Sequence, residues 1–130
     1  MSQVATIDRR DRGGIYRLGM TQPPTMADLE ALRICVGTVV RAEPNTGARD
    51  PAFRLWIDVG ADQPVQSSAK ITDRYTAEEL IGRSVVVVTG FAPIRIGGFR
   101  SDVLVLGALT ADGVVLLRPD DDVSPGSEVA

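Results

Sequence analysis

Histidine is absent from the 130 residues of this chain, and cysteine occurs only once, as Cys35. Without an imidazole, the chain lacks the commonest general base and the usual activator of a serine or cysteine nucleophile. A zinc site of the usual kind is also excluded, because it needs several cysteine or histidine ligands. A single cysteine cannot form an internal disulfide and is typical of a reducing compartment. We therefore expect a protein that is not an enzyme and that holds no metal and no other cofactor.

Long apolar runs are missing as well. The longest, SVVVVTGF over residues 84–91, has the length of a strand, whereas a membrane span needs about 20 apolar residues. Residues 1–25 contain four arginines and no apolar core of the kind found in secretory signals. We therefore expect no membrane insertion and a cytoplasmic location. Residues 1–25 also lack periodicity and end in TQPPT, so we expect 1–26 to be a flexible extension and 27–130 to form one domain.

An excess of positive charge is the third feature that is missing. The chain has 14 Lys and Arg against 17 Asp and Glu, which gives a formal net charge of −3. This balance argues against a protein that coats nucleic acid generally, because such a protein needs a basic surface. A local basic groove remains compatible with it, since the positions of charges matter more than their sum.

One serine motif, taken alone, would indicate an enzyme. The residues SSAK, from Ser67 to Lys70, match the Ser-x-x-Lys pattern of β-lactam-binding serine enzymes. That chemistry needs a helix, which places the serine and lysine side chains on one face. Here the motif lies in a strand-like run, and SDV (101–103) and VTG (88–90) only approximate the companion motifs. We therefore reject the catalytic interpretation.

The patterning of apolar residues predicts mostly strands. The segments concerned are 33–43, 53–60, 64–71, 84–91, 101–109 and 112–117. Gly37 inside the first segment predicts a bulge or a tight coil. A short helix is predicted over residues 28–33, with Asp28 as its cap. A second is predicted over residues 76–82, with Thr76 and Glu79 as a capping box and Gly82 as the stop.

The order of these elements predicts the fold class. Three strands, a short helix and then two or more strands suit an all-β, five-stranded Greek-key barrel, the OB-fold. The helix between strands 3 and 4 would plug one end of the barrel. A β-sandwich is the alternative, although a sandwich has no need of the helix.

Half of the ten basic residues that follow Met26 lie beside predicted loops or at predicted strand ends. They are Arg49, Arg54, Lys70, Arg95 and Arg100. Cations on the loops and on one face of an OB-fold barrel are placed to displace counterions from RNA phosphates. The alternative is that these side chains are ordinary solvated charges.

Small and aromatic residues near these cations also suit RNA. Gly97 and Gly98 let the main chain approach a phosphate closely and offer bare N–H donors. Hydroxyl groups can bond to sugar or phosphate oxygens, or else to their own backbone. The hydroxyl candidates are Ser67, Ser68 and Ser101. Phe53 and Trp56 could stack on bases, or one could pack in the core and the other lie at an interface.

Six stretches, in this order, carry a resemblance to a known family: RICVGTVVRAE, PAFRLWIDVG, SSAKIT, YTAEELIG, FAPIRIGGFRSDVLVLG and PDDDVSPGS. From about Leu29 to Val129 the chain resembles the stand-alone tRNA-binding domain proteins of the CsaA-like (secretion chaperone) class. It is also similar to the C-terminal tRNA-binding domain of some methionyl-tRNA synthetases. The resemblance implies a homodimeric OB-fold that binds tRNA by its structure, and a chaperone that binds unfolded or exported polypeptides.

The resemblance also implies particular site residues. In the family, the segment that matches PIRIGGFRSD contacts RNA, which implies binding roles for Arg95, Ser101 and Asp102. At some positions this chain departs from the residue usual in the family. The departures are Arg33, Cys35, Lys70, Gly90 and Ile94.

Apolar residues outside a minimal five-stranded barrel need to be covered. They are Leu29, Leu32, Val114, Val115, Leu116, Leu117 and Pro119. A two-fold partner would bury them in one isologous interface, so we expect N- and C-terminal extensions that serve in dimerisation. The alternative is that the C-terminal segment packs on its own barrel. An apolar cleft between two subunits would also suit an unfolded polypeptide, whose binding is the alternative function.

Overall fold

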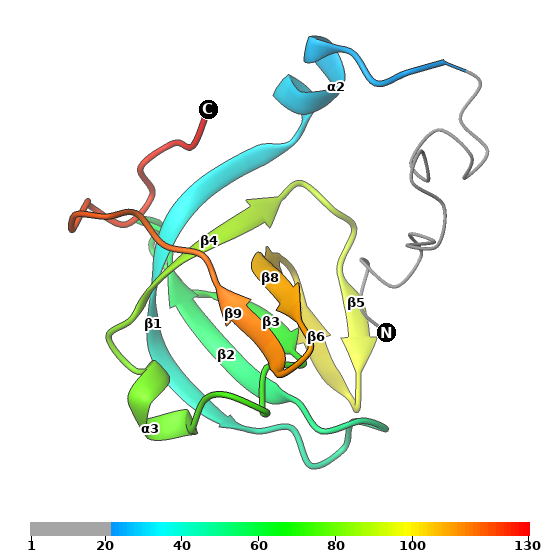
Figure 1. Ribbon diagram of the computed structural model, residues 1–130, viewed down its shortest axis with the longest axis vertical. Helices are drawn as coiled ribbons and strands as arrows, with labels where there is room; N and C mark the ends of the chain where they lie inside the picture. Colours follow the sequence, from blue (N-terminus) through cyan, green and yellow to red (C-terminus); the bar gives the residue numbers. More distant parts are fainter. Residues whose placement is uncertain (1–21) are drawn as a thin grey trace. The chain divides into compact units, whose positions relative to one another are not determined.

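The computed structural model describes residues 22–130, which are drawn in colour in Figure 1. They belong to two compact units, one that ends at Leu32 and one that runs from Arg33 to Ala130, and each unit is described by itself. The extension predicted over residues 1–26 lies almost wholly outside the described residues. Within the described range, no helix is long and apolar enough to cross a membrane.

The first unit contains helix α2, Met26–Ala31. We predicted Asp28 as the cap of this helix, but the cap is Thr25. The Thr25 hydroxyl accepts a hydrogen bond from the Asp28 N–H, and the Asp28 carboxylate accepts one from the Thr25 N–H. The prediction was wrong because the acidic residue of a capping box stands at the third helical position, not at the cap itself.

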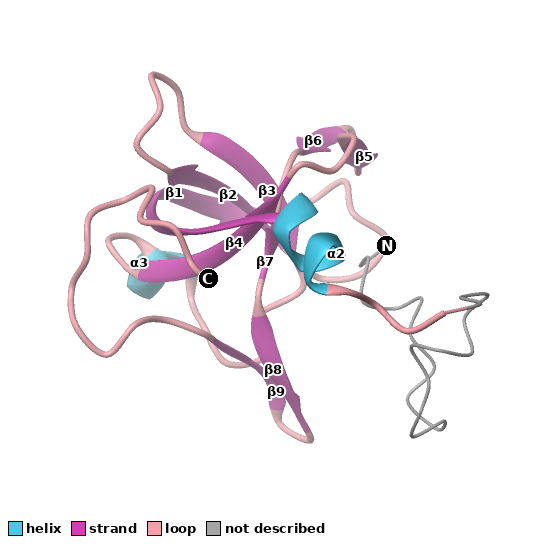
Figure 2. Cartoon of the chain, turned by 90° about the horizontal axis from the view of Figure 1, so that it is seen from above, coloured by secondary structure: helices cyan, strands magenta, loops and turns pink. Residues whose placement is uncertain are grey.

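The second unit is a five-stranded sheet that rolls into a nearly closed barrel (Figures 1 and 2). Its strands are β1 (Arg33–Pro44), β2 (Phe53–Asp58), β3 (Val65–Ala69), β4 (Ser84–Thr89) and β7 (Leu104–Val105). They lie in the order β3-β2-β1-β4-β7, and each neighbouring pair is antiparallel. The predicted all-β OB-fold barrel is thereby confirmed.

Strand β1 is the longest strand and is shared by both halves of the barrel. Its first half pairs with β4 and its second half with β2. A register shift between Val39 and Arg41 leaves Val40 as the extra residue of a bulge, which bends the strand. We predicted a bulge or a tight coil at Gly37. Gly37 instead lies so close to β2 that a Cβ atom there would overlap the Ile57 side chain, so its glycine serves close packing.

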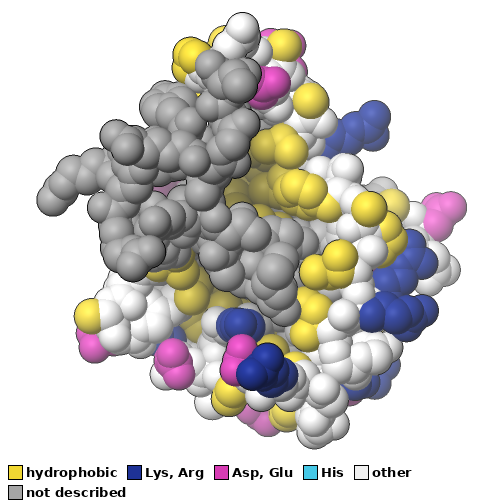
Figure 3. Space-filling view, turned by 90° about the vertical axis from the view of Figure 1, so that its right-hand side faces the viewer, with side chains coloured by type: hydrophobic (Ala, Val, Ile, Leu, Met, Phe, Trp, Pro, Cys, Tyr) yellow, Lys and Arg dark blue, Asp and Glu magenta, His cyan; other side chains and the backbone are white. Residues whose placement is uncertain are grey.

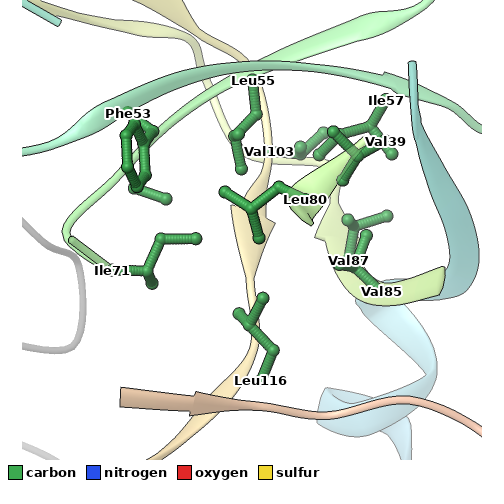
Figure 4. Packing of buried hydrophobic residues seen from close by; sticks show 11 residues of the cluster. Val39, Phe53, Leu55, Ile57, Ile71, Leu80, Val85, Val87, Val103 and Leu116 are labelled. Carbon is green, nitrogen blue, oxygen red and sulfur yellow. The ribbon is translucent and has the colours of Figure 1, made fainter. Parts of the chain in front are cut away.

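Helix α3, Ala77–Leu80, follows β3 and confirms the second predicted helix. Its capping box joins Thr76 and Glu79 as expected, and Gly82, with a φ of 86°, follows the last turn. Leu80 is fully buried. In Figure 4 its side chain points in among Leu55, Ile71 and Leu116, so the helix fills one end of the barrel.

Burial on β2 fixes which side chains point outward. Phe53, Leu55 and Ile57 are buried in the core, while Arg54 and Trp56 between them are only partly buried. Fully burying a large apolar side chain stabilises a fold by about 1.5–3 kcal/mol. A slip of one residue would expose three such side chains, so the outward direction of Arg54 and Trp56 is firmly set.

The segment after β4 differs from the prediction. We predicted no strand between residues 91 and 101, but the structure has a hairpin of β5 (Ile94–Ile96) and β6 (Phe99–Ser101). The hairpin forms because Gly97 and Gly98 take φ values of 59° and 77°, as a tight two-residue turn requires. The two glycines therefore end one strand and start another rather than hinge an open loop.

The single strand predicted over residues 101–109 is also broken into pieces. The N–H groups of Asp102 and Val103 donate to the Gln66 carbonyl at 2.8 and 3.3 Å, which brings the chain onto β3 and closes the barrel. The chain then continues as β7 and as β8 (Gly107–Thr110). One continuous strand could not bend enough to bond first to β3 and then to β4.

The C-terminal part forms a hairpin and then a segment that bonds to β1. Strand β8 pairs with β9 (Gly113–Leu116) in a hairpin that projects on another side of the barrel from β5–β6 (Figure 2). Farther along, the N–H groups of Gly126 and Val129 donate to carbonyls of β1 at 2.7 and 2.8 Å. Leu116 is 5% exposed and belongs to the core, so it has no surface to offer a partner.

Candidate nucleic-acid interface

The β1–β2 loop, residues 45–52, touches the turn of the β5–β6 hairpin through the backbone of both. A Cβ atom at Gly47 would overlap the carbonyl oxygen of Gly97, and one at Gly97 would overlap the backbone of Gly47 and Ala48. Only glycine fits at these two positions. In OB-folds, ligands bind at the loop between strands 1 and 2, the loop between strands 4 and 5, and the face of strands 2 and 3. In this protein the β1–β2 loop is the first of these connections, and the β5–β6 hairpin belongs to the second, between β4 and β7.

A buried asparagine supports this contact from inside. Asn45 is 4% exposed. Its amide nitrogen donates to the Ile96 carbonyl at 3.0 Å and to the Ser68 hydroxyl at 3.1 Å, and its amide oxygen accepts from Arg54 Nε at 3.0 Å. One side chain thereby joins the loop to β2, to β3 and to the hairpin. Asn45 was not among the predicted site residues, although the PNTG turn directly after a strand is a typical place for such an asparagine.

The five cations predicted from the sequence lie around the loop–hairpin contact, and we call them the cationic face. Its members are Arg49, Arg54, Lys70, Arg95 and Arg100. Arg95 and Arg100 are directly paired across the hairpin, and Arg54 reaches the Gly97 carbonyl at 3.4 Å. In Figure 3, Lys and Arg side chains lie along the right-hand edge of the surface in view, and others lie lower down beside Asp or Glu side chains. The barrel therefore brings together charges that are up to 51 residues apart in the chain, from Arg49 to Arg100.

Two members of the cationic face are paired with carboxylates. Lys70 Nζ lies 2.9 Å from Asp50 Oδ2, and Arg100 Nε lies 2.6 Å from Asp102 Oδ1. The hydrogen bond and the charge of Lys70 lower the pKa of Asp50, so this pair persists at neutral pH and is lost as pH falls through the lowered value. Both pairs are partly exposed to solvent, where a phosphate can compete with a carboxylate.

The other three members have no carboxylate partner among the described residues. Arg54 is held by Asn45 and lies with its guanidinium 5.2 Å from the Phe99 ring centroid, so it also supports the hairpin. Arg95 Nη1 donates to the Gly98 carbonyl at 3.1 Å. Arg49 and Arg95 are exposed, and within residues 22–130 no ion pair has to be lost before they offer their charge to a ligand.

The candidate hydroxyls face inward more than the sequence indicated. Ser67 and Ser101 are only 2% and 4% exposed. The Ser101 hydroxyl accepts from the Ser68 N–H at 3.1 Å, and Asp102 Oδ2 accepts from the Gln66 N–H at 3.3 Å. Because these groups hold the hairpin against β3, we no longer count Ser67 and Ser101 among the candidate RNA contacts.

A family model described as "Putative tRNA binding domain" matches residues 34–128. The chain belongs to this tRNA-binding domain family. The match includes every member of the cationic face, the hairpin and most of the C-terminal segment on β1. The resemblance stated from the sequence is confirmed.

Curated relatives of this tRNA-binding domain are much longer proteins. It is 41% identical over 97 residues to a methionine–tRNA ligase of Methanothrix thermoacetophila, and 34% identical over 104 residues to one of Methanococcoides burtonii. These matches cover 75% and 79% of this chain but only 14% and 15% of the ligases. The chain therefore spans about one seventh of the length of these relatives.

Two solved structures similar to the tRNA-binding domain match along their whole length. Chaperone CsaA from Bacillus anthracis has a TM-score of 0.78 and 44% identity, with 84% of this chain and 100% of that chain covered. The CsaA chaperone protein from Picrophilus torridus has a TM-score of 0.78 and 39% identity, with 83% and 100% covered. These likenesses agree with the barrel described above.

The structure also decides which aromatic residue can stack on a base, whether Cys35 is reactive, and whether a metal site is present among the described residues. Phe53 is buried in the core, whereas Trp56 lies on the outer face of β2, so only Trp56 remains a candidate for stacking. Burial raises the pKa of the Cys35 thiol, which keeps it in the unreactive thiol form at neutral pH. Across residues 22–130, no three His, Cys, Asp or Glu side chains gather as a metal site would require.

Proposed function

We propose that this protein binds tRNA through the cationic face and catalyses no reaction on it. The observation that carries the proposal is the backbone contact of Gly47 with Gly97, which gathers five cations of an acidic chain around one end of the barrel. RNA association is driven largely by counterion release from phosphates, which local positive charge brings about. The methionine–tRNA ligases, which contain a homologous segment, are named for a tRNA substrate.

A titration with bulk tRNA at several salt concentrations tests this function. Structured RNA is recognised mainly through its shape and its sugar–phosphate backbone, so binding to the cationic face has little dependence on sequence and a strong dependence on salt. Saturable binding that weakens steeply as salt rises supports the proposal. A protein that fails to bind tRNA even at low salt contradicts it.

Asp50 is expected to compete with RNA phosphates for Lys70. Replacing it by asparagine removes the carboxylate that neutralises Lys70 at 2.9 Å, so Asp50→Asn should bind tRNA about two- to fivefold more tightly at low salt. A matched control is Asp62→Asn, which makes the same change of net charge in the β2–β3 turn, away from the β1–β2 loop. Equal gains in the two variants would show that only net charge matters, against the pairing described.

The protein acts as a homodimer in this proposal. Leu109 and Leu117 of the β8–β9 region are 46% and 44% exposed, and Val114 and Val115 are only partly buried. The interface expected from the sequence comprises Leu29, Leu32, Val114, Val115, Leu117 and Pro119, with the buried Leu116 now left out and the exposed Leu109 added. Leu117→Asp is expected to give monomers by light scattering, because a buried unpaired carboxylate is costly at an apolar interface. Leu117→Met, which keeps the apolar surface, should stay dimeric, and a parent protein that is itself monomeric would rule out the interface.

A second candidate function is the binding of unfolded or exported polypeptides. The observation that favours it is the likeness, at 44% and 39% identity, to two proteins named as CsaA chaperones. Apolar capture of a polypeptide should persist as salt rises, whereas phosphate contacts should weaken. Competition between bulk tRNA and an unfolded polypeptide at low and high salt therefore separates the two functions.

A further inference from the structure

Trp56 lies in a row of three paired residues on the outer face of the sheet. Arg41 on β1 pairs with Trp56 on β2, and Trp56 pairs with Gln66 on β3. Directly paired residues of neighbouring strands project to the same face and touch. The next pair along β2 and β3 on this face is Arg54 with Ser68, so this row adjoins the cationic face although it contains none of its members.

The indole of Trp56 is held in a fixed position. Phe99 of the hairpin meets it edge-on, with ring centroids 5.1 Å apart and an interplanar angle of 72°. The Gln66 amide, oriented so that both of its ends are satisfied, accepts from Trp56 Nε1 at 3.0 Å and donates to the Arg100 carbonyl at 3.2 Å. These contacts hold the ring in place, and the ring face that carries Arg41 is the surface on which another group can stack.

The group that stacks on this ring is a cation. The Arg41 guanidinium carbon lies 4.3 Å from the centre of the Trp56 ring, and the Arg41 side chain is 63% exposed. Its Nη2 also pairs with Glu43 at 2.9 Å. An exposed arginine can be exchanged for another flat group at little cost, because surface ion pairs and exposed cation–π contacts are each weak.

We propose that the Trp56 ring is a stacking site for one unpaired nucleobase of RNA. The base takes the place of the Arg41 guanidinium on the indole, and Arg41 turns to an adjacent phosphate. The charges around the ring favour this occupant over an apolar peptide: Arg41 stacks on Trp56, and Arg54 lies over Phe99, which contacts Trp56. RNA supplies a flat base together with phosphates for the arginines, whereas an apolar peptide would bury the same cations without partners.

This inference rests on the proposed RNA binding and makes it more specific. Phosphate contacts alone do not distinguish paired from unpaired RNA, whereas a base can stack on Trp56 only when it is free of a partner strand. The protein should therefore prefer RNA with a single-stranded loop or end. Trp56 and Arg41 would be the residues that give this preference.

The single tryptophan of the chain provides the test. The probes are a short single-stranded oligoadenylate and an abasic oligoribonucleotide of the same length and charge. Oligoadenylate should quench Trp56 fluorescence and bind about 5- to 100-fold more tightly than the abasic chain. Trp56→Leu should remove this difference, so that the variant binds the two probes with equal affinity. Arg41→Gln, which uncovers the ring, should retain quenching by oligoadenylate and bind both probes more weakly.

Other outcomes overturn the inference in distinguishable ways. If the parent protein binds both probes equally, or if both quench Trp56 equally, no base stacks on the ring, while the proposed phosphate-directed binding still holds. If neither probe and no tRNA binds at low salt, the proposed function and the stacking site both fail. Quenching of the parent protein does not depend on whether Trp56→Leu folds.

Discussion

Replacing Arg95 and Arg100 together by alanine should weaken tRNA binding about 10- to 100-fold at low salt. The two residues are directly paired across the β5–β6 hairpin, so both can meet one stretch of phosphates. Exposed charge-assisted contacts are each worth about 1 kcal/mol, and 1.4 kcal/mol corresponds to a tenfold change in affinity. Both side chains are on the surface, so the barrel should remain folded by circular dichroism. Fluorescence anisotropy with labelled tRNA measures the loss.

Two controls separate charge from position. Arg95→Lys with Arg100→Lys keeps both charges and should retain most of the affinity, because phosphates accept lysine as a point charge. Arg118→Ala removes an exposed arginine beside Gly82 and Ser84, at the start of β4 rather than near the hairpin that follows β4, and should change little. If the double alanine variant binds as tightly as the parent, or if Arg118→Ala costs as much, the cationic face is not the binding surface.

The second large effect is expected from Gly97→Ala. Gly97 has a φ of 59°, and a Cβ atom there would overlap the backbone of Gly47 and Ala48. Backbone cannot move aside as a flexible side chain can, so the hairpin must separate from the β1–β2 loop. We expect a loss of about 2–4 kcal/mol in the free energy of unfolding, from left-handed strain and overpacking together. We also expect tRNA affinity to fall about tenfold or more, because Arg95 and Arg100 move with the hairpin.

Gly98→Ala is the matched control for this variant. Gly98 stands next to Gly97 in the same turn and has a similar φ of 77°, but a Cβ atom there would meet nothing within 4 Å. Gly98→Ala should therefore cost only the left-handed strain, about 1–2 kcal/mol, and should leave tRNA binding nearly unchanged. Chemical denaturation and anisotropy on both variants measure the difference. Equal losses of tRNA affinity would contradict a role for the loop–hairpin contact in placing the cations.

The parts of the fold that could be predicted depend on local patterns. The alternation along β2 fixed its buried and outward residues, and the Thr76–Glu79 capping box with Gly82 located α3. The β5–β6 hairpin was missed because its strands are only three residues long, and a Gly–Gly pair is equally typical of an open loop. A bulge was one of two interpretations of Gly37, but the bulge lies at Val40, and a Cβ atom at Gly37 would overlap Ile57, which the sequence does not reveal.

The candidate site was predictable in its charges but not in their partners. Arg49, Arg54, Lys70, Arg95 and Arg100 could be chosen because they stand beside loops of an expected barrel. Asp50 and Lys70 are 20 residues apart, and Asn45 and Ile96 are 51 apart, so their contacts exist only once the barrel closes. The stacking of Arg41 on Trp56 depends likewise on strand register, which the Val40 bulge sets.

The salt dependence of tRNA binding, compared between the parent and Arg49→Ala with Arg95→Ala, tests the central claim most directly. These are the exposed members of the cationic face without a carboxylate partner in the described part of the chain. If both contact phosphates, the slope of the logarithm of affinity against the logarithm of salt concentration should become shallower by about 1 for each arginine removed. A double variant with the slope of the parent would show that tRNA binds elsewhere or without these cations.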